Sequence, residues 1–172
     1  MPSRHAKEIL AVTLTGEEIP VLFTALEGEK LGGDGGGDST RIRMYRFKDK
    51  NIEKTDIASL PGNLCRFLTY GDTDGDGQKE LIASTKSDGI WKLIPSDEGW
   101  EKQLVASGTS GFEHATYLMD FDGNGRDEIY VASDNEGEFR VYYYNGRGYS
   151  ADVIDTLKEH TITFNVTAAI VE

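Results

Sequence analysis

The chain has 172 residues and a hydrophobic fraction of 38%, which suffices for one folded domain with a core. Its formal net charge of -12 argues against nucleic acid or an anionic membrane surface as a partner, because both attract clusters of Lys and Arg. No apolar run approaches the ~20 residues of a membrane span, and the sequence begins without the apolar stretch of a signal peptide. The single cysteine, Cys65, rules out an internal disulfide and lies in the apolar run 64–68, where we expect an inert strand residue.

The segment 1–60 predicts a four-stranded β-unit, because short runs rich in β-branched and aromatic residues are separated by turn residues. The turn at 15–18, between its first two strands, is too short to hold a cation. The glycine-rich stretch 31–39 separates its two hairpins, and we interpret it as a surface insertion. We expect the four strands at 9–14, 20–26, 41–47 and 52–60.

Two further units follow as copies of one pattern. The spacing from Asp72 to Asp120 equals the spacing from Glu80 to Glu128, so the acidic positions recur with a fixed period. A repeat of about 48 residues with four short strands is typical of β-propeller blades. We expect strands at 64–70, 80–85, 89–94 and 100–106 in the second unit, and at 115–119, 128–133, 138–144 and 149–157 in the third.

The sequence therefore predicts a single all-β domain over residues 1–172, a β-propeller-type array of four-stranded antiparallel blades. Its blade-like units span about 5–60, 64–110 and 114–158, and an extra strand is expected at 161–171. Closed propellers have ~4 to 8 blades. Three blades and a strand leave three alternatives: a fragment, copies that associate as a homo-oligomer through open blade edges, or an unusual closure.

The loop of the second unit carries oxygen ligands at alternate positions. In an extended segment alternate side chains share one face, and Gly75 and Gly77 allow the chain to curl. The side chains then converge on one point, where water can complete the coordination of a divalent cation. The predicted ligands are Asp72, Asp74, Asp76, the carbonyl of Gln78, and Glu80.

The loop of the third unit offers the same set with one change. Asn124 supplies a neutral amide where the second unit has a carboxylate, and we therefore expect weaker binding at this loop. A titration in which Asn124→Asp binds calcium no tighter would contradict that order. The predicted ligands are Asp120, Asp122, Asn124, the carbonyl of Arg126, and Glu128.

The ligand chemistry favours Ca²⁺, which accepts 6–8 hard oxygen ligands in a forgiving geometry, with Mg²⁺ as the second choice. The absence of thiolate and imidazole from the loops argues against Zn²⁺ and copper. An EF-hand opens similarly but needs Glu at position 12, where these loops have Ala83 and Val131, and it needs flanking helices. An Asp/Gly-rich turn that binds no metal remains the alternative.

The run Asp-x-Asp-Gly-Asp-Gly-x-x-Glu-Leu-Ile-Ala resembles the FG-GAP repeat, also described as the VCBS-type repeat. The resemblance covers residues 64–157 and is weak over 1–60, where the metal loop is missing. It implies the propeller blades of integrin α-subunits and of many secreted bacterial proteins, with Ca²⁺ bound in the loop between the first two strands of a blade. It also implies an extracellular or periplasmic location.

A second constellation consists of four basic residues. His5, His114 and His160 each precede a predicted first strand, and Arg66 stands one repeat before His114. The innermost strands of a propeller line its channel, so the four side chains would surround one mouth and bind an anionic ligand. The alternative is that they are unrelated polar residues at strand ends.

No catalytic arrangement of Ser, Cys or His is evident. We therefore expect a calcium-binding module that serves as a non-catalytic binding, adhesion or interaction scaffold for a protein or carbohydrate ligand. The alternative is a fragment of a propeller enzyme that acts on carbohydrate as a lyase and uses the His/Arg-lined mouth.

Overall fold

The computed structural model describes residues 5–29, 39–62, 64–86, 89–107, 113–133, 137–156, 158 and 166–167. Every regular element in this part of the chain is a β-strand, and the strands form three four-stranded antiparallel sheets. The first sheet contains β1 (Ala6–Val12), β2 (Val21–Glu29), β3 (Ser39–Lys48) and β4 (Asn51–Pro61). The second contains β5 (Cys65–Gly71), β6 (Glu80–Thr85), β7 (Gly89–Ser96) and β8 (Gly99–Ala106). The third contains β9 (Glu113–Met119), β10 (Glu128–Ser133), β11 (Glu138–Tyr144) and β12 (Tyr149–Thr156).

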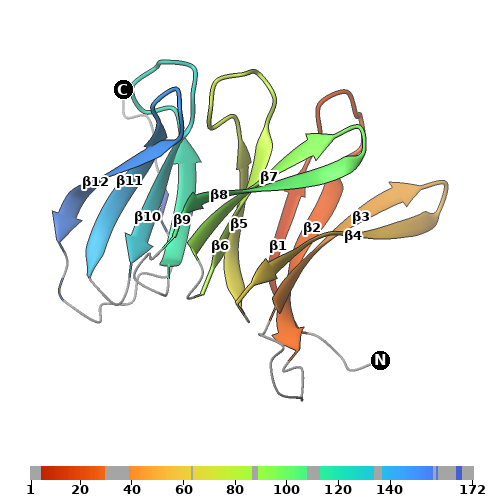
Figure 1. Ribbon diagram of the computed structural model, residues 1–172. Helices are drawn as coiled ribbons and strands as arrows, with labels where there is room; N and C mark the ends of the chain where they lie inside the picture. The colour runs from red at the N-terminus through yellow and green to blue at the C-terminus, as the bar shows by residue number, and fades with distance from the viewer. Residues whose placement is uncertain are drawn as a thin grey trace.

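Each sheet is a meander, in which strands that follow one another in the chain pair side by side. Figure 1 shows the three sheets standing next to one another in chain order. Their first strands meet, since β5 contacts both β1 and β9. This is the arrangement of successive blades in a β-propeller, and the predicted all-β, blade-like fold class is confirmed.

Two apolar cores hold the sheets together. The core between the first and second sheets packs Phe23 and Ile42 against Leu81 and Leu93. The core between the second and third sheets is smaller and consists of Ile82, Ile90, Ile129, Val131 and Tyr142. All of β6 is buried because this strand supplies alternate residues to both cores.

The strands predicted for the second and third units agree with the observed ones to within two residues at every end. The strand predicted at 9–14 is present, but its bounds are displaced, because β1 occupies Ala6–Val12. The apolar residue Leu14 is buried, but its carbonyl accepts the N–H of Glu17 at 3.0 Å, so the chain has already turned there. The predicted strand extended too far because Leu14 is a buried apolar residue that lies in a turn.

Two predictions fall mainly outside the described residues. Of the strand expected at 161–171, only Val166 and Thr167 are described, and neither lies in a strand. Of the glycine-rich stretch 31–39, only Ser39 is described, and it begins β3. No helix in the described ranges is long and apolar enough to span a membrane.

The thiol of Cys65 is buried, and burial raises its pKa to about 12. Only the thiolate reacts with thiol reagents, and an unfolded chain has a cysteine pKa near ~8.5. At pH 8 we expect the folded protein to react at least ~100-fold more slowly than the protein in denaturant, measured with a chromogenic disulfide reagent. Equal rates in the two conditions would contradict the burial of Cys65.

Candidate metal centre

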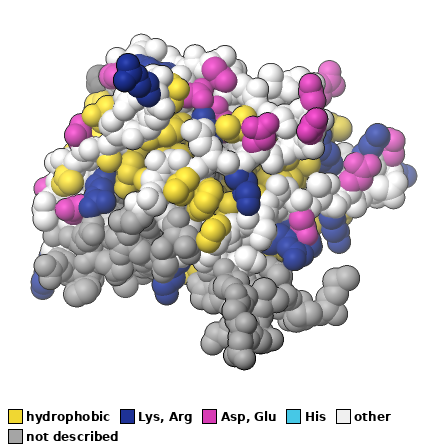
Figure 2. Space-filling view, viewed as in Figure 1, with side chains coloured by type: hydrophobic (Ala, Val, Ile, Leu, Met, Phe, Trp, Pro, Cys, Tyr) yellow, Lys and Arg dark blue, Asp and Glu magenta, His cyan; other side chains and the backbone are white. Residues whose placement is uncertain are grey.

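The loops that join the first and second strands of the three sheets lie at one end of the molecule (Figure 1). In the second sheet this loop is 72–79, and in the third sheet it is 120–127. Asp and Glu side chains are exposed along the same end in the space-filling view (Figure 2). The loop of the first sheet, 13–20, has the same length as the other two, so the prediction that it is shorter is wrong. It carries Glu17, whose carboxylate pairs with Arg46 of β3.

Asp72 organises the loop of the second sheet. Its two carboxylate oxygens accept the N–H groups of Gly75 at 2.7 Å and Gly77 at 2.9 Å. Both glycines have positive φ, +79° and +86°, so the tight curl depends on the conformational freedom of glycine. At the far end of the loop, Glu80 accepts the N–H of Thr73 at 3.1 Å and its hydroxyl at 2.9 Å.

The loop of the third sheet repeats this hydrogen-bond plan except at one N–H donor, where Asn124 rather than Gly123 binds the first Asp. Asp120 accepts the N–H groups of Asn124 and Gly125, both at 2.9 Å. Glu128 accepts the N–H of Phe121 at 3.0 Å, as Glu80 does for the equivalent residue of the second sheet. Each loop is thus closed by its first Asp and by the Glu that begins the following strand.

The carboxylates of each loop converge. In each set, one oxygen from every residue lies within 4.8 Å of the corresponding oxygens of the others. Two ligands of one Ca²⁺, each 2.3–2.6 Å from the ion, can be at most about 5.2 Å apart. The spacing within each set is therefore compatible with one shared ion. The sets are Asp72, Asp74, Asp76 and Glu80 in the second sheet, and Asp120, Asp122 and Glu128 in the third.

The three other predicted ligands are the side chain of Asn124 and the backbone carbonyls of Gln78 and Arg126. The bonds of Gln78 and Arg126 given below involve their N–H and side-chain groups, so their carbonyls stay predicted ligands. Asn124 donates its side-chain amide to Asp122 at 2.8 Å, so the amide group already lies against a carboxylate of the set. The backbone N–H of Arg126 donates to the side-chain oxygen of Asn124 at 2.9 Å. The Gln78 side chain turns away from the loop to the carbonyl of Pro95 at 2.6 Å, while its N–H donates to Asp76 at 2.7 Å.

The sequence analysis missed Lys92, a residue of β7 that is only 2% exposed. Its ammonium lies 2.5 Å from Asp74 Oδ2 and 4.0 Å from Glu80 Oε1. Burial acts to lower the pKa of Lys92, but the hydrogen bond to Asp74 and the nearby acidic groups more than offset it, so the pKa is raised. A lysine inside the apolar run 89–94 was the signal that could have revealed this residue.

Burial also acts on Glu80, whose pKa is raised to about 7. The bonds from Thr73 and the charge of Lys92 oppose the shift, while Asp74 adds to it. A buried carboxylate among other carboxylates is costly to ionise unless a cation is close. The site therefore has the electrostatic character of a cation-binding cluster.

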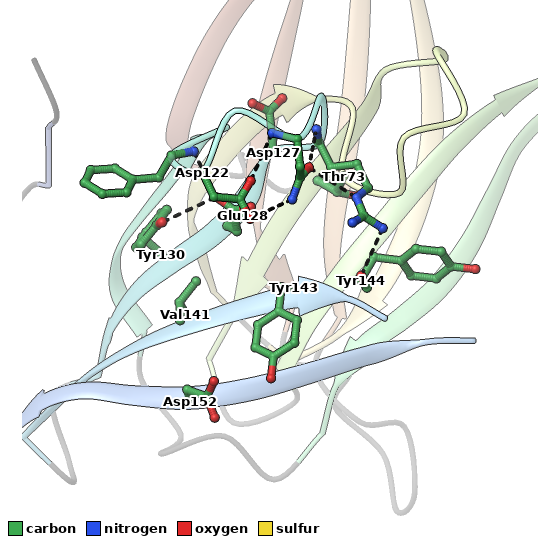
Figure 3. A pocket seen from close by; sticks show the side chains of 12 residues that line it. Thr73, Asp122, Asp127, Glu128, Tyr130, Val141, Tyr143, Tyr144 and Asp152 are labelled. Atoms are coloured by element: carbon green, nitrogen blue, oxygen red, sulfur yellow. Dashed lines mark hydrogen bonds between the residues drawn. The ribbon is translucent and has the colours of Figure 1, made fainter. Parts of the chain in front are cut away.

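A pocket of about 370 Å³ lies beside the loop of the third sheet. Its walls include Asp122 from the loop, Glu128 from the start of β10, and Val141 and Tyr143 from β11 (Figure 3). Glu128 is 8% exposed and lines this pocket. Two members of the ligand set of the third sheet thus line this pocket. In the second sheet, Asp74 and Glu80 face Lys92, while Asp76 lines a separate pocket of about 770 Å³.

The two loops touch each other through Asp127. Its N–H donates to the carbonyl of Asp72 at 2.7 Å, and its carboxylate accepts the N–H of Asp72 at 3.0 Å. The approach needs Gly71, because a Cβ there would lie 2.2 Å from Asp127 Oδ2. The hydroxyls of Thr73 and Tyr149 form a second bridge at 2.6 Å.

The predicted ring of basic residues is described only in part. The imidazole of His5 lies 3.6 Å from Glu27, and the positive charge of Arg66 acts on the carboxyl of Glu8. The two described members therefore each have an acidic neighbour. The side chain of His114 and all of His160 lie outside the described residues, so the ring stays a prediction.

No protein-family model matches the chain, and no curated protein matches it at a significant level. The resemblance to FG-GAP repeats consequently stays a prediction that depends on the acidic loops and their spacing.

Replacing Gly71 with Ala should push the two loops apart and lower the free energy of unfolding by about 1–3 kcal/mol. Gly148→Ala is the matched control, since a Cβ at Gly148 meets nothing within 4 Å, and we expect a change within ~0.5 kcal/mol. Urea unfolding of both variants measures the difference. Equal stability of the two variants would show that the Asp72–Asp127 contact does not constrain this junction.

Proposed function

We propose that the protein is a calcium-binding module of propeller type, in which the ions hold the loops at one end of the sheets and the sheets serve as a non-catalytic interaction scaffold. The observation that carries the proposal is the repetition of one loop in two sheets. Both loops have the same closing hydrogen bonds and a set of carboxylate oxygens within 4.8 Å of one another.

Repetition supports the proposal because isolated acidic turns are common without metal. A single cluster could form as a by-product of Asp-Gly turn geometry. Here the residues that close the loop are Asp and Gly, but Glu80 and Glu128 come from the following strands and are buried. A turn alone does not require a buried carboxylate at that position, whereas a cation site does.

Calcium is the ion that best suits these ligands. All the groups are hard oxygen donors, and the loop of the second sheet brings four carboxylates to one point. Mg²⁺ prefers a stricter octahedron with several waters, so it is the second choice. The resemblance to FG-GAP repeats supports the same assignment and an extracellular or periplasmic location.

The scaffold role is supported by the outer face of the third sheet. An apolar hollow of about 440 Å³ lies there, with almost no polar surface in its walls, next to the 71% exposed side chain of Phe121. Exposed apolar surface of this kind supports a role in contact with another protein. The residues that line the hollow include Tyr117, Met119, Phe121, Tyr130, Phe139 and Ile154.

Calcium should raise the melting temperature relative to EDTA, because an ion that binds only the folded chain stabilises it by mass action. One site at 100-fold excess over its Kd contributes about 2.7 kcal/mol, which corresponds to about 5–10 °C for a chain of this length. Differential scanning fluorimetry in calcium, in magnesium and in EDTA, at matched ionic strength, measures the shift.

Loop variants separate specific binding from a general charge effect. The double variant Asp72→Asn with Asp120→Asn should lose the calcium-dependent shift, since both loops lose their first ligand. Asp97→Asn, the same chemical change at an exposed turn outside the loops, should retain it. A melting temperature of the parent protein that calcium leaves unchanged would overturn the proposed function.

Self-association is the first scaffold activity to test. Replacing Phe121 with Ser should lower the average mass measured by light scattering at high protein concentration, because it removes exposed apolar area beside the hollow. Phe47→Ser is the control, since Phe47 is also exposed but lies on β3. A monomer at every concentration, unaltered by either change, would exclude self-association as the role of this face.

A further inference from the structure

The three sheets differ in the positive side chain that lies beside the loop between their first and second strands. In the second sheet Lys92 of β7 partly neutralises the acidic side chains at this loop. In the first sheet Arg46, also on the third strand of its sheet, pairs with Glu17. The third sheet differs, and strand register shows how.

Register identifies the residue of the third sheet that corresponds to Lys92. Lys92 pairs with Ile82, two residues after Glu80. In the third sheet, Tyr130 stands two residues after Glu128, and its partner is Val141. The place of the buried ammonium is therefore taken by an aliphatic side chain. Figure 3 shows Val141 on β11, on the side of the pocket opposite the loop.

We propose that the ammonium of Lys92 is the built-in cation of the loop in the second sheet, and that the loop of the third sheet is the site that binds a metal ion first. The inference rests on the proposed calcium-binding function and assigns it an order. It reverses the order expected from Asn124, which considered only the loop residues.

Charge count no longer favours the loop of the second sheet once Lys92 is included. Its four carboxylates and one ammonium carry a formal charge of -3, as do the three carboxylates of the third sheet. The position of the positive charge then decides. An ion bound among Asp72, Asp74 and Glu80 would lie within a few Å of the Lys92 ammonium, where the two cations repel each other. Metal binding there must displace Lys92 from Asp74.

The third sheet offers the ion room and a free ligand atom. Val141 lines the pocket of about 370 Å³, together with Asp122 and Glu128, and it also borders the apolar hollow of the same sheet. Both hydrogen bonds to Glu128 from the described residues, from Phe121 and Tyr130, go to Oε2. Within that part of the chain no hydrogen bond reaches Oε1.

Arg126 belongs to this loop and carries a positive charge, but it does not take the role of Lys92. Its Nε donates to the side-chain oxygen of Asn124 at 3.2 Å, and Nη1 donates to the carbonyl of Tyr144 at 3.4 Å. Both partners are neutral. The guanidinium therefore borders the site without an ion pair to Asp122 or Glu128 among the described residues.

Calcium stoichiometry and affinity, measured by isothermal titration calorimetry on the full chain, test the assignment. We expect the parent protein to bind one ion in its tighter phase, and Glu128→Gln to weaken that phase by at least about tenfold. Glu80→Gln should change it less than about threefold. Lys92→Met removes the internal cation and should yield a second ion whose affinity lies within about tenfold of the first.

The reciprocal variant makes the test independent of how well Lys92→Met folds. Val141→Lys places an ammonium into the pocket of the third sheet and should weaken the tighter phase by at least about tenfold. Val141→Met has a similar length without charge and should retain the affinity of the parent protein.

The possible outcomes test the role of Lys92 and the order of the two sites separately from calcium binding itself. No calcium binding by the parent protein overturns both. Two ions of equal affinity, unaffected by Lys92→Met, leave the calcium function intact and overturn the role of Lys92. A tighter phase that is lost with Glu80→Gln and retained in Glu128→Gln or Val141→Lys overturns the order of the two sites.

Discussion

The structure depends on one constraint: a hairpin loop that closes on the carboxylate of its own first residue. Asp72 and Asp120 each accept two backbone N–H groups, and this curls the chain so that the next acidic side chains point to the same place. Closure by hydrogen bonds thereby concentrates negative charge within a few Å. A nearby positive charge stabilises such a cluster, and in the second sheet Lys92 supplies one.

Local pattern was enough to predict most of the fold. Strands alternate with Asp- and Gly-rich turns that need no distant information, so the second and third sheets appeared in the sequence at nearly their observed limits. Leu14 misled the prediction because a buried residue in a turn resembles a strand residue in composition. Seven carboxylates of the candidate site were likewise predictable, since they lie within two short loops.

Lys92 could not be assigned from spacing, because its role depends on pairing between strands. The spacing that aligns Glu80 with Glu128 also aligns Lys92 with Arg140. Spacing alone therefore suggests a basic side chain beside the loop in both sheets. The connection from β10 to β11 is one residue longer than that from β6 to β7, so the structural counterpart becomes Val141. Arg140 lies one position earlier and pairs with Glu138 instead. One extra residue between the two strands thus places Val141 where the second sheet has the buried ammonium of Lys92. This is expected because successive side chains of a strand point to opposite faces of the sheet.

The position of the open site relative to the cores explains why an ion would matter there. The first and second sheets share the larger apolar core. In each of them a basic side chain, Arg46 or Lys92, pairs with an acidic residue of the loop at any calcium concentration. The third sheet joins the second through a smaller core and through the contacts of Asp127 and Tyr149 with the neighbouring loop. An ion held by Asp120, Asp122 and Glu128 would fix the loop from which Asp127 projects. Calcium would therefore act on the junction where apolar packing contributes least, which is the place where an external ligand has the largest effect on the cohesion of the array.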